Sequence, residues 1–164
     1  MKILYVITSL GVGGAEKVVS AMADKAFSEG HDVKIVCLTG PVLIKPQSQD
    51  VEVIALNMKG YYSFISAFLR LIGIVRKFKP DVVHGHMVHA NIIVRFARLF
   101  SRIPVLVCSA HNKFEGGLGR MLAYRFANWL GDYFTNVSYE AAASLEAAGA
   151  AKRNTIIPIC NGID

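Results

Sequence analysis

The stretch that decides the fold is residues 2–16, KILYVITSLGVGGAE. Its first part, residues 2–8, is short, apolar and β-branched, as expected of a buried strand. From Ala15 to Phe27 the apolar residues recur at helical spacing, which predicts a helix directly after the glycines. A strand, a glycine turn and a helix in this order are typical of the start of an α/β domain.

The glycine loop, Gly11 to Glu16, has two possible explanations. Glycine tolerates a positive φ and lets bare backbone N–H groups approach a ligand, and the following helix directs its positive dipole end to the same place. The loop could therefore bind an anion, typically a phosphate. A tight turn between strand and helix without any ligand would use the same glycines.

Two well-known phosphate-binding motifs are excluded. The dinucleotide motif needs a third glycine three residues after the second, and Glu16 stands at that position. The acidic ribose ligand expected after the second strand is also missing, because that strand ends Val36-Cys37-Leu38-Thr39. The chain contains no Gly-Lys-Ser or Gly-Lys-Thr, so it has no P-loop.

Length and composition favour one folded domain. The chain has 164 residues, of which 53% are hydrophobic and 18% charged, and this composition excludes disorder. No uncharged apolar run approaches the roughly 18 residues that a membrane span requires. The three cysteines, Cys37, Cys108 and Cys160, are odd in number, widely separated and set in apolar runs. This pattern predicts reduced, buried thiols in a cytoplasmic protein.

Positive charge is concentrated in the middle of the chain. The net charge is +6, yet residues 59–139 alone carry eleven basic and three acidic side chains. Such a field suits a phosphate or an anionic membrane surface. Arg95, Arg98 and Arg102 form one stripe of a predicted helix, and we expect this stripe, with Arg70 and Lys77, to face outward, as a solvated surface or a lipid contact. Nucleic acid is not expected, because no aromatic residues are interleaved with these cations.

The remaining hydrophobic patterns predict an alternation of strands and helices. A loop over residues 39–50 separates the second and third strands, and the third is expected at a sheet edge. The apolar arc of the helix over residues 61–78 is predicted to pack on the sheet. Further strands are predicted at residues 31–38, 51–56, 81–86, 104–109, 133–137 and 154–159, and further helices at residues 88–102, 118–130 and 138–148. The fold class is therefore α/β, a Rossmann-like, doubly wound, mostly parallel sheet with helices on both faces.

Three polar clusters follow strands of this predicted sheet: the glycine loop, His84 with His86, and His111-Asn112. Ligands of parallel sheets bind at the carboxyl ends of the strands, so these clusters should converge on one edge. The histidines could be hydrogen-bonded strand-end residues, or they could line a polyol or phosphate pocket. A zinc site that also includes His89 is not expected, because no acidic residue or cysteine is placed to complete it. His111 is the candidate for chemistry, since it follows a strand and imidazole can donate or accept near neutral pH.

Five motifs, in order along the chain, resemble the retaining family-4 glycosyltransferases. They are Gly13-Gly14-Ala15-Glu16, Asp81-Val82-Val83-His84-Gly85-His86, Ser109-Ala110-His111-Asn112, Val137-Ser138, and Pro158 followed by Asn161-Gly162-Ile163-Asp164. One departure is that Ile159 and Cys160 separate Pro158 from Asn161, where the family usually has proline directly before Asn-Gly.

The resemblance implies one half of a GT-B fold, in which two Rossmann-like domains face each other across a cleft. Residues 1–158 would be the N-terminal, acceptor-side domain and residues 159–164 the start of the linker to a C-terminal nucleotide-sugar domain. It implies retaining transfer of a hexosyl group from a nucleotide-diphosphate sugar to a glycan or lipid-linked acceptor, with no cofactor and no metal. The cytoplasm, or the inner face of a membrane, is the expected location.

The resemblance also assigns roles to particular residues. Gly13 and Gly14 would approach the donor diphosphate, and His111 would lie beside the transferring sugar as the catalytic residue. Glu16, His86 and Asn112 would shape the acceptor or sugar pocket. Two alternatives remain open at this stage: a free-standing sugar- or phosphate-binding module without catalysis, and a complete small α/β enzyme that uses the histidines as its site.

Overall fold

The structure is a computed structural model that describes residues 1–113 and 116–160. It contains a seven-stranded sheet, and every neighbouring pair of strands is parallel, in the order β3-β2-β1-β4-β5-β6-β7. The strands are β1 (Lys2–Leu10), β2 (Asp32–Val42), β3 (Glu52–Ala55), β4 (Val82–His86), β5 (Val105–Ala110), β6 (Tyr133–Asn136) and β7 (Ile157–Pro158). The helices are α1 (Gly14–Ser28), η1 (Tyr61–Ser63), α2 (Phe64–Phe78), α3 (Val88–Ala97), α4 (Leu118–Ala127), η2 (Asn128–Leu130) and α5 (Tyr139–Ala147).

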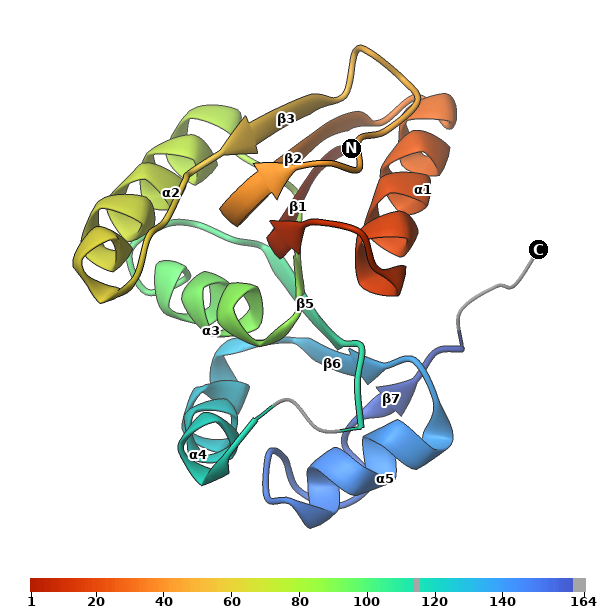
Figure 1. Cartoon of the computed structure of the whole chain (residues 1–164), viewed down its shortest axis with the longest axis vertical. Coiled ribbons are helices and arrows are strands. Elements are labelled where there is room, and N and C mark those ends of the chain that lie inside the picture. Colours follow the sequence, from red (N-terminus) through yellow and green to blue (C-terminus); the bar gives the residue numbers. More distant parts are fainter. Residues whose placement is uncertain (114–115, 161–164) are drawn as a thin grey trace.

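Helices cover both faces of the sheet. In Figure 1, α1 lies on one side of the strands, while α2, α3 and α4 lie on the other. From β1 the chain adds β2 and β3 toward one edge of the sheet, and from β4 onward it adds strands toward the opposite edge. Because each crossover is right-handed, the two directions place their helices on opposite faces. Two hydrophobic cores result, one beneath α1 and one that includes residues of α2, α3, α4 and α5. The predicted fold class, a Rossmann-like α/β domain, is confirmed.

Glycine sets the end of α1 and the packing of α3. Gly30 has a φ of 83°, and its N–H bonds to the carbonyl of Phe27 while the N–H of His31 bonds to that of Ala26, which is the Schellman arrangement. Gly85, in the middle of β4, has no side chain, and this allows α3 to pack closely against the strand. A Cβ there would stand 2.8 Å from Asn91 Oδ1 and 2.9 Å from Val94 Cγ2.

Several predicted boundaries were wrong. β2 runs to Val42 rather than ending at residue 38, because Leu10 pairs with Val42 across a register shift. The helix predicted over residues 88–102 ends at Ala97 and closes in tight turns. The last strand has two residues instead of six, since the Glu146 carboxylate accepts the backbone N–H groups of residues 154–156 that a longer ladder would need.

The apolar arc of α2 is wider than the face that packs on the sheet. Leu71 and Val75 are buried in the core, but Ile65 is 68% exposed and Leu69 61% exposed. The prediction that the whole arc covers the sheet was therefore wrong for Ile65 and Leu69, whereas Phe68 packs against the core. No described helix is both long and apolar enough to cross a membrane.

The predicted basic stripe on α3 is not an outward-facing surface. Arg95 is fully buried, with its guanidinium carbon 5.2 Å from the ring centre of Tyr124 and 4.8 Å from that of Phe134. Arg98 is held by the carbonyl of Leu130 and by an ion pair with Asp132, and of the three only Arg102 is exposed. The helix turns Arg95 inward because α4 and β6 supply aromatic rings that only the tertiary structure brings there.

The cysteine prediction was right for two residues. Cys37 and Cys108 are buried free thiols, but Cys160 is exposed, because the chain leaves the sheet after β7. The predicted linker falls largely outside the described residues, as does the motif at residues 161–164.

Candidate functional site

The carboxyl ends of β1, β4, β5 and β6 form the edge to which the sequence assigned its polar clusters. We call this edge the carboxyl rim. His84 and His86 lie two apart on β4 and point the same way, with ring centres 3.9 Å apart. His86 pairs in register with Ser109, and Ser109 pairs with Thr135, so three adjacent strands bring polar side chains to the same level.

His111 lies directly against His86. His86 Nδ1 is 2.9 Å from His111 Nε2. His86 Nε2 is buried and has no hydrogen-bond partner in the described part of the chain. A bare lone pair costs less to bury than an unpaired N–H. We therefore assign the proton to His86 Nδ1, which donates to His111 Nε2, and this makes His111 Nε2 an acceptor.

A second chain of hydrogen bonds runs behind the pair. His84 Nε2 lies 2.7 Å from Ser109 Oγ, which lies 2.6 Å from Thr135 Oγ1. Both hydroxyls are buried. The sequence analysis did not propose Ser109 or Thr135 as site residues, although both stand at the carboxyl ends of strands, and that rule would have found them.

All three histidines are held neutral. Burial lowers the pKa of His84 to about 3, with a further contribution from the nearby His111. Burial, and then the two neighbouring imidazoles, lower the pKa of His86 well below its ordinary value. Burial also lowers the pKa of His111, while the negative charge of Glu16 opposes the shift. At neutral pH the rim therefore presents uncharged imidazoles, which can donate and accept but do not attract anions as cations would.

The glycine loop delivers Glu16 to the same region. The Glu16 carboxylate is buried and accepts a hydrogen bond from Ser9 Oγ at 3.3 Å. A Cβ on Gly13 would collide with this carboxylate, whereas a Cβ on Gly14 would meet nothing within 4 Å. None of the loop glycines has a positive φ, so the expectation that they provide one was wrong. Gly13 is needed for close approach, and Gly14 leaves open space at the start of α1.

Asn112 is exposed beside this group. Its backbone carbonyl accepts a hydrogen bond from Asn136 Nδ2 at 3.3 Å, and Asn136 Oδ1 accepts the N–H of Val137 at 2.7 Å. Buried Asn136 thus ties the segment after β5 to the end of β6, and it is a second positioning residue that the sequence analysis missed.

A small cavity of about 110 Å³ opens among these residues. Its polar wall contains the three histidines and Ser109, Thr135 and Asn136, and its apolar wall contains Val18, Met22 and Ile159. Ligand pockets usually measure roughly 300–1,000 Å³. The cavity is therefore large enough for only part of a sugar-sized ligand.

The rim histidines are not arranged as metal ligands. His86 and His111 bond to each other and His84 bonds to Ser109, so their nitrogens do not converge on one point. No group of three or more histidine, cysteine or acidic side chains within residues 1–113 and 116–160 is placed to hold a metal ion.

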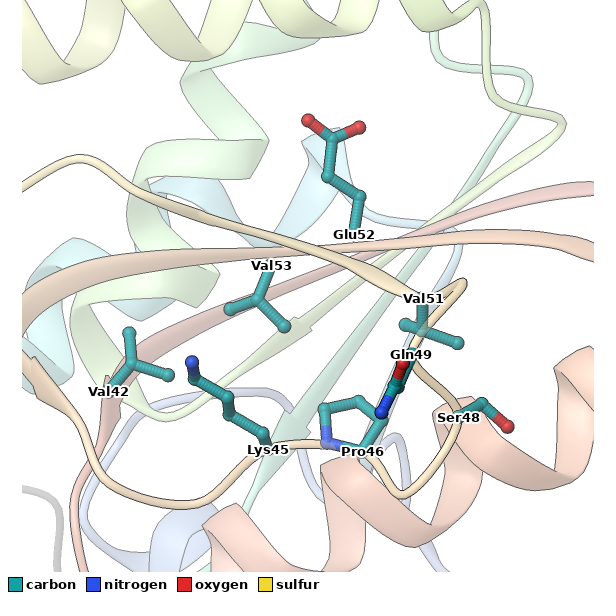
Figure 2. Close-up of a pocket in the computed structure, with 8 residues that line it drawn as sticks. All are labelled: Val42, Lys45, Pro46, Ser48, Gln49, Val51, Glu52 and Val53. Atoms are coloured by element: carbon teal, nitrogen blue, oxygen red, sulfur yellow. The ribbon is translucent and has the colours of Figure 1, made fainter.

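A larger hollow of about 400 Å³ lies away from the rim, between the loop before β3 and β3 itself. Figure 2 shows Val53 pointing toward Lys45 while Glu52 points the opposite way. Glu52 forms an ion pair with Lys34 on β2. The hollow thus lacks a cluster of catalytic groups, and we assign the candidate site to the carboxyl rim.

One protein family matches most of the chain. The sequence profile of Glycosyltransferase Family 4 matches residues 12–164. The chain belongs to this family. The match extends from the glycine loop past the last strand and includes all three rim clusters. No curated protein sequence matches the chain significantly.

Solved structures with the same fold include one from Rickettsia africae and one from Anabaena. A glycosyltransferase from Rickettsia africae ESF-5 has a TM-score of 0.82 at 18% identity, over 99% of this chain and 43% of that one. Alr3699/HepE from Anabaena, in complex with UDP, has a TM-score of 0.77 at 16% identity, over 100% of this chain and 45% of that one. This family-4 chain thus spans less than half the length of either structure and has the fold of one GT-B half.

The fold alone does not select a transferase. A protein from Listeria monocytogenes described as a putative UDP-N-acetylglucosamine 2-epimerase has a TM-score of 0.62 at 18% identity, over 94% of this chain and 44% of that one. Identities this low show a shared fold, and it is the family match over residues 12–164 that identifies the chain as a family-4 glycosyltransferase domain.

Proposed function

We propose that this chain is the N-terminal, acceptor-side half of a retaining glycosyltransferase. It would transfer a hexosyl group from a nucleotide-diphosphate sugar to a glycan or lipid-linked acceptor. The observation that carries the proposal is the neutral His86–His111 pair at the carboxyl rim, beside the glycine loop of a family-4 chain. The UDP named in the Anabaena complex supports a nucleotide-diphosphate donor.

The glycine loop would receive the donor diphosphate. Gly13 precedes the first residue of α1, Gly14, so the free N–H groups of the first helical turn and the helix dipole point to the same place. The open space at Gly14 leaves room for phosphate oxygens against bare backbone. Glu16 carries a negative charge, and we place it against sugar hydroxyls rather than against the diphosphate.

His111 would contact the transferring sugar. As a neutral imidazole it can hydrogen-bond a sugar hydroxyl without competing with the donor phosphates for charge. His86 keeps that ring in one orientation by donating to Nε2, and Asn112 would complete the acceptor side. In a retaining reaction of this family the leaving phosphate accepts the acceptor's proton, so the rim needs no general base of its own and no metal.

The remaining wall of the site would come from a second domain. We propose that residues 1–158 form the acceptor-side domain and that residues 159–164 begin the linker to a nucleotide-sugar domain. Loss of orientation between two reactants removes on the order of 7–11 kcal/mol of barrier reduction. We therefore expect the 164-residue chain to fold but not to transfer sugar at a useful rate. We propose that the protein is cytoplasmic, either free or peripheral on the inner face of a membrane.

The test uses a longer form that contains both domains, incubated with a panel of nucleotide sugars. Gly14→Val should abolish transfer with little loss of stability, because nothing within this domain occupies that space. His111→Ala should lower kcat more than it weakens donor binding. His31→Gln, at the opposite edge of the sheet, serves as the control. Near-normal turnover of both rim variants, or multiple turnover by the 164-residue chain alone, would contradict the proposal.

A further inference from the structure

A hollow of about 540 Å³ lies between the end of α4 and the segment that joins α5 to β7. Phe126 and Trp129 line one part of it, and Lys152 and Thr155 line another. Trp129 comes shortly before β6, and Thr155 comes shortly before β7. The hollow therefore lies at the amino ends of these strands, at the opposite edge of the sheet from the carboxyl rim. We call it the α4 hollow.

The two aromatic rings of the α4 hollow are turned away from the core. In the same stretch Tyr124, Ala127 and Leu130 are at most 5% exposed, whereas Phe126 is 74% exposed and Trp129 is 75% exposed. Residues three apart in a helical stretch lie on one side of it, so Phe126 and Trp129 share the outer side. Large exposed aromatic side chains that lie together are typical of a binding surface.

Two cations lie in the same hollow. Arg125 and Lys152 line it and are exposed. None of the ion pairs among the described residues involves either of them. The nearby Glu146 carboxylate accepts the backbone N–H groups of residues 154–156, and these three hydrogen bonds offset its negative charge. The hollow is therefore both aromatic and positive.

We propose that the α4 hollow binds a sugar unit that carries a carboxylate or phosphate group. The C–H face of a sugar ring packs on aromatic side chains, while guanidinium and ammonium groups bind an anionic substituent through charge-assisted hydrogen bonds. The volume of the hollow lies within the range of roughly 300–1,000 Å³ that is usual for ligand pockets. Ala151, which is 4% exposed, forms part of the wall, and its small side chain leaves this space open.

Other occupants fit the α4 hollow less well. A second copy of the chain in a two-fold contact would bring the Arg125 and Lys152 side chains of both copies together, and like charges oppose that contact. Single-stranded nucleic acid binds along a groove whose cations follow successive phosphates, whereas the described lining supplies two cations. An uncharged sugar would leave both cations without a partner.

This inference adds a second saccharide site to the domain, and it does not depend on whether the rim transfers sugar. The site can be observed separately, because Trp129 is the single tryptophan of the sequence. Its fluorescence, and the NMR signal of its indole N–H, therefore report on the α4 hollow and not on the carboxyl rim.

The experiment is a titration of the 164-residue chain with glucuronic acid, glucose 6-phosphate, glucose and inorganic phosphate, followed by both Trp129 signals. At least one of the two acidic sugars should give a saturable change. Glucose and inorganic phosphate should bind about tenfold more weakly or less, since each lacks one half of the recognition. A response to glucuronic acid alone identifies a carboxylate as the anionic group, and a response to glucose 6-phosphate alone identifies a phosphate.

The variants separate the two parts of the site. Arg125→Gln with Lys152→Gln keeps the reporter and should weaken binding by about tenfold or more. Phe126→Ala should weaken it roughly threefold to tenfold, because it removes one aromatic face. Lys77→Gln with Arg102→Gln removes the same charge at exposed positions outside the lining and should leave binding unchanged. Far-ultraviolet circular dichroism of each variant confirms that the fold is kept.

Equal weakening in the two charge variants would overturn the proposal, because it would show attraction by the overall charge. Inorganic phosphate that binds as tightly as either acidic sugar, or no change in either Trp129 signal with any of the sugars, would also overturn it. Tighter binding of a single-stranded oligonucleotide would identify nucleic acid as the occupant instead. If the fluorescence depends on protein concentration rather than on the sugars, the hollow joins two copies of the chain and the proposal is wrong.

Discussion

His86 Nδ1 lies 2.9 Å from His111 Nε2, within hydrogen-bond distance, and this contact joins the end of β4 to the segment after β5. The two residues are 25 positions apart in the sequence, and this hydrogen bond connects them at the carboxyl rim. The bond leaves His86 Nε2 as a buried lone pair and holds the His111 ring in one orientation. His86 is therefore a positioning residue, and His111 is the residue that would contact a ligand.

His86→Leu should disturb His111 without unfolding the domain. Losing the hydrogen bond from His86 should raise the activation free energy by about 1.5 kcal/mol. In a two-domain form this corresponds to roughly a tenfold loss of kcat, with a smaller change in KM. In the 164-residue chain, nitrogen NMR should show His111 passing from one tautomer to a mixture. His86→Gln, whose amide can donate, should restore part of both effects. An unchanged His111 tautomer in His86→Leu would show that His86 does not position it.

Gly85→Ala should destabilise the domain. The new Cβ would stand 2.8 Å from Asn91 Oδ1 and 2.9 Å from Val94 Cγ2, so α3 must shift away from β4. Overpacking of this kind costs about 1–3 kcal/mol. Gly73→Ala is the matched control, because Gly73 is exposed within α2 with nothing within 4 Å, and the change should stabilise by about 0.5–1 kcal/mol. Urea unfolding measures both, and effects of the same sign would contradict this account of Gly85.

Arg95 should respond to substitution as a core residue. Its guanidinium packs on Tyr124 and Phe134, and Nη2 donates to Asn128 Oδ1, while Nε and Nη1 have no oxygen or nitrogen partner within the described residues. Arg95→Ala leaves a cavity and should cost about 2–4 kcal/mol. Arg95→Met fills most of that space and removes a buried charge, so the stability should be unchanged or higher.

The control for this prediction comes from the segment that follows α3. Arg102→Ala, at an exposed position after α3, should change the free energy of unfolding by less than about 0.5 kcal/mol. If Arg95→Ala were as mild as Arg102→Ala, the burial of Arg95 would be wrong. If Arg95→Met were as damaging as Arg95→Ala, the cation itself would stabilise the core.

The domain should lose stability as the pH falls below the ordinary pKa of histidine. The pKa values of His84, His86 and His111 are lowered in the folded state, so unfolding takes up protons. The stabilisation is complete above about pH 6.5, the unfolded value, and decreases as the pH falls toward the folded values. Each histidine changes the free energy of unfolding by up to about 1.4 kcal/mol per pH unit.

Urea unfolding between pH 7.5 and pH 5 measures this slope. The double variant His84→Asn with His86→Asn should flatten it, because the substituted side chains do not titrate. A wild-type stability that stays constant over this interval would contradict the burial of these imidazoles. Far-ultraviolet circular dichroism at each pH shows whether the folded baseline is intact.

Much of the fold could be predicted because each element carries its own pattern. β1 is a continuous apolar run, α1 begins after glycine and ends at Gly30, and the Ser138 side chain caps α5 by accepting the N–H of Ala141. Such signals are local, so they can be recognised without knowing which elements pack against each strand or helix. The start of β7 could not be predicted, since the Glu146 carboxylate binds the backbone N–H groups just before it, eight to ten residues further along the chain.

The sequence by itself determined the order of strands and helices, and it determined that polar clusters follow the strands. Because parallel strands end at a common edge, it also determined that the clusters containing His86 and His111 would lie at one edge of the sheet. The tertiary structure alone decided which side chains are buried, turning Arg95 inward and leaving Ile65 and Leu69 exposed. Helical periodicity specifies a direction around one helix, but burial depends on which neighbours occupy that direction, and those neighbours come from distant parts of the chain.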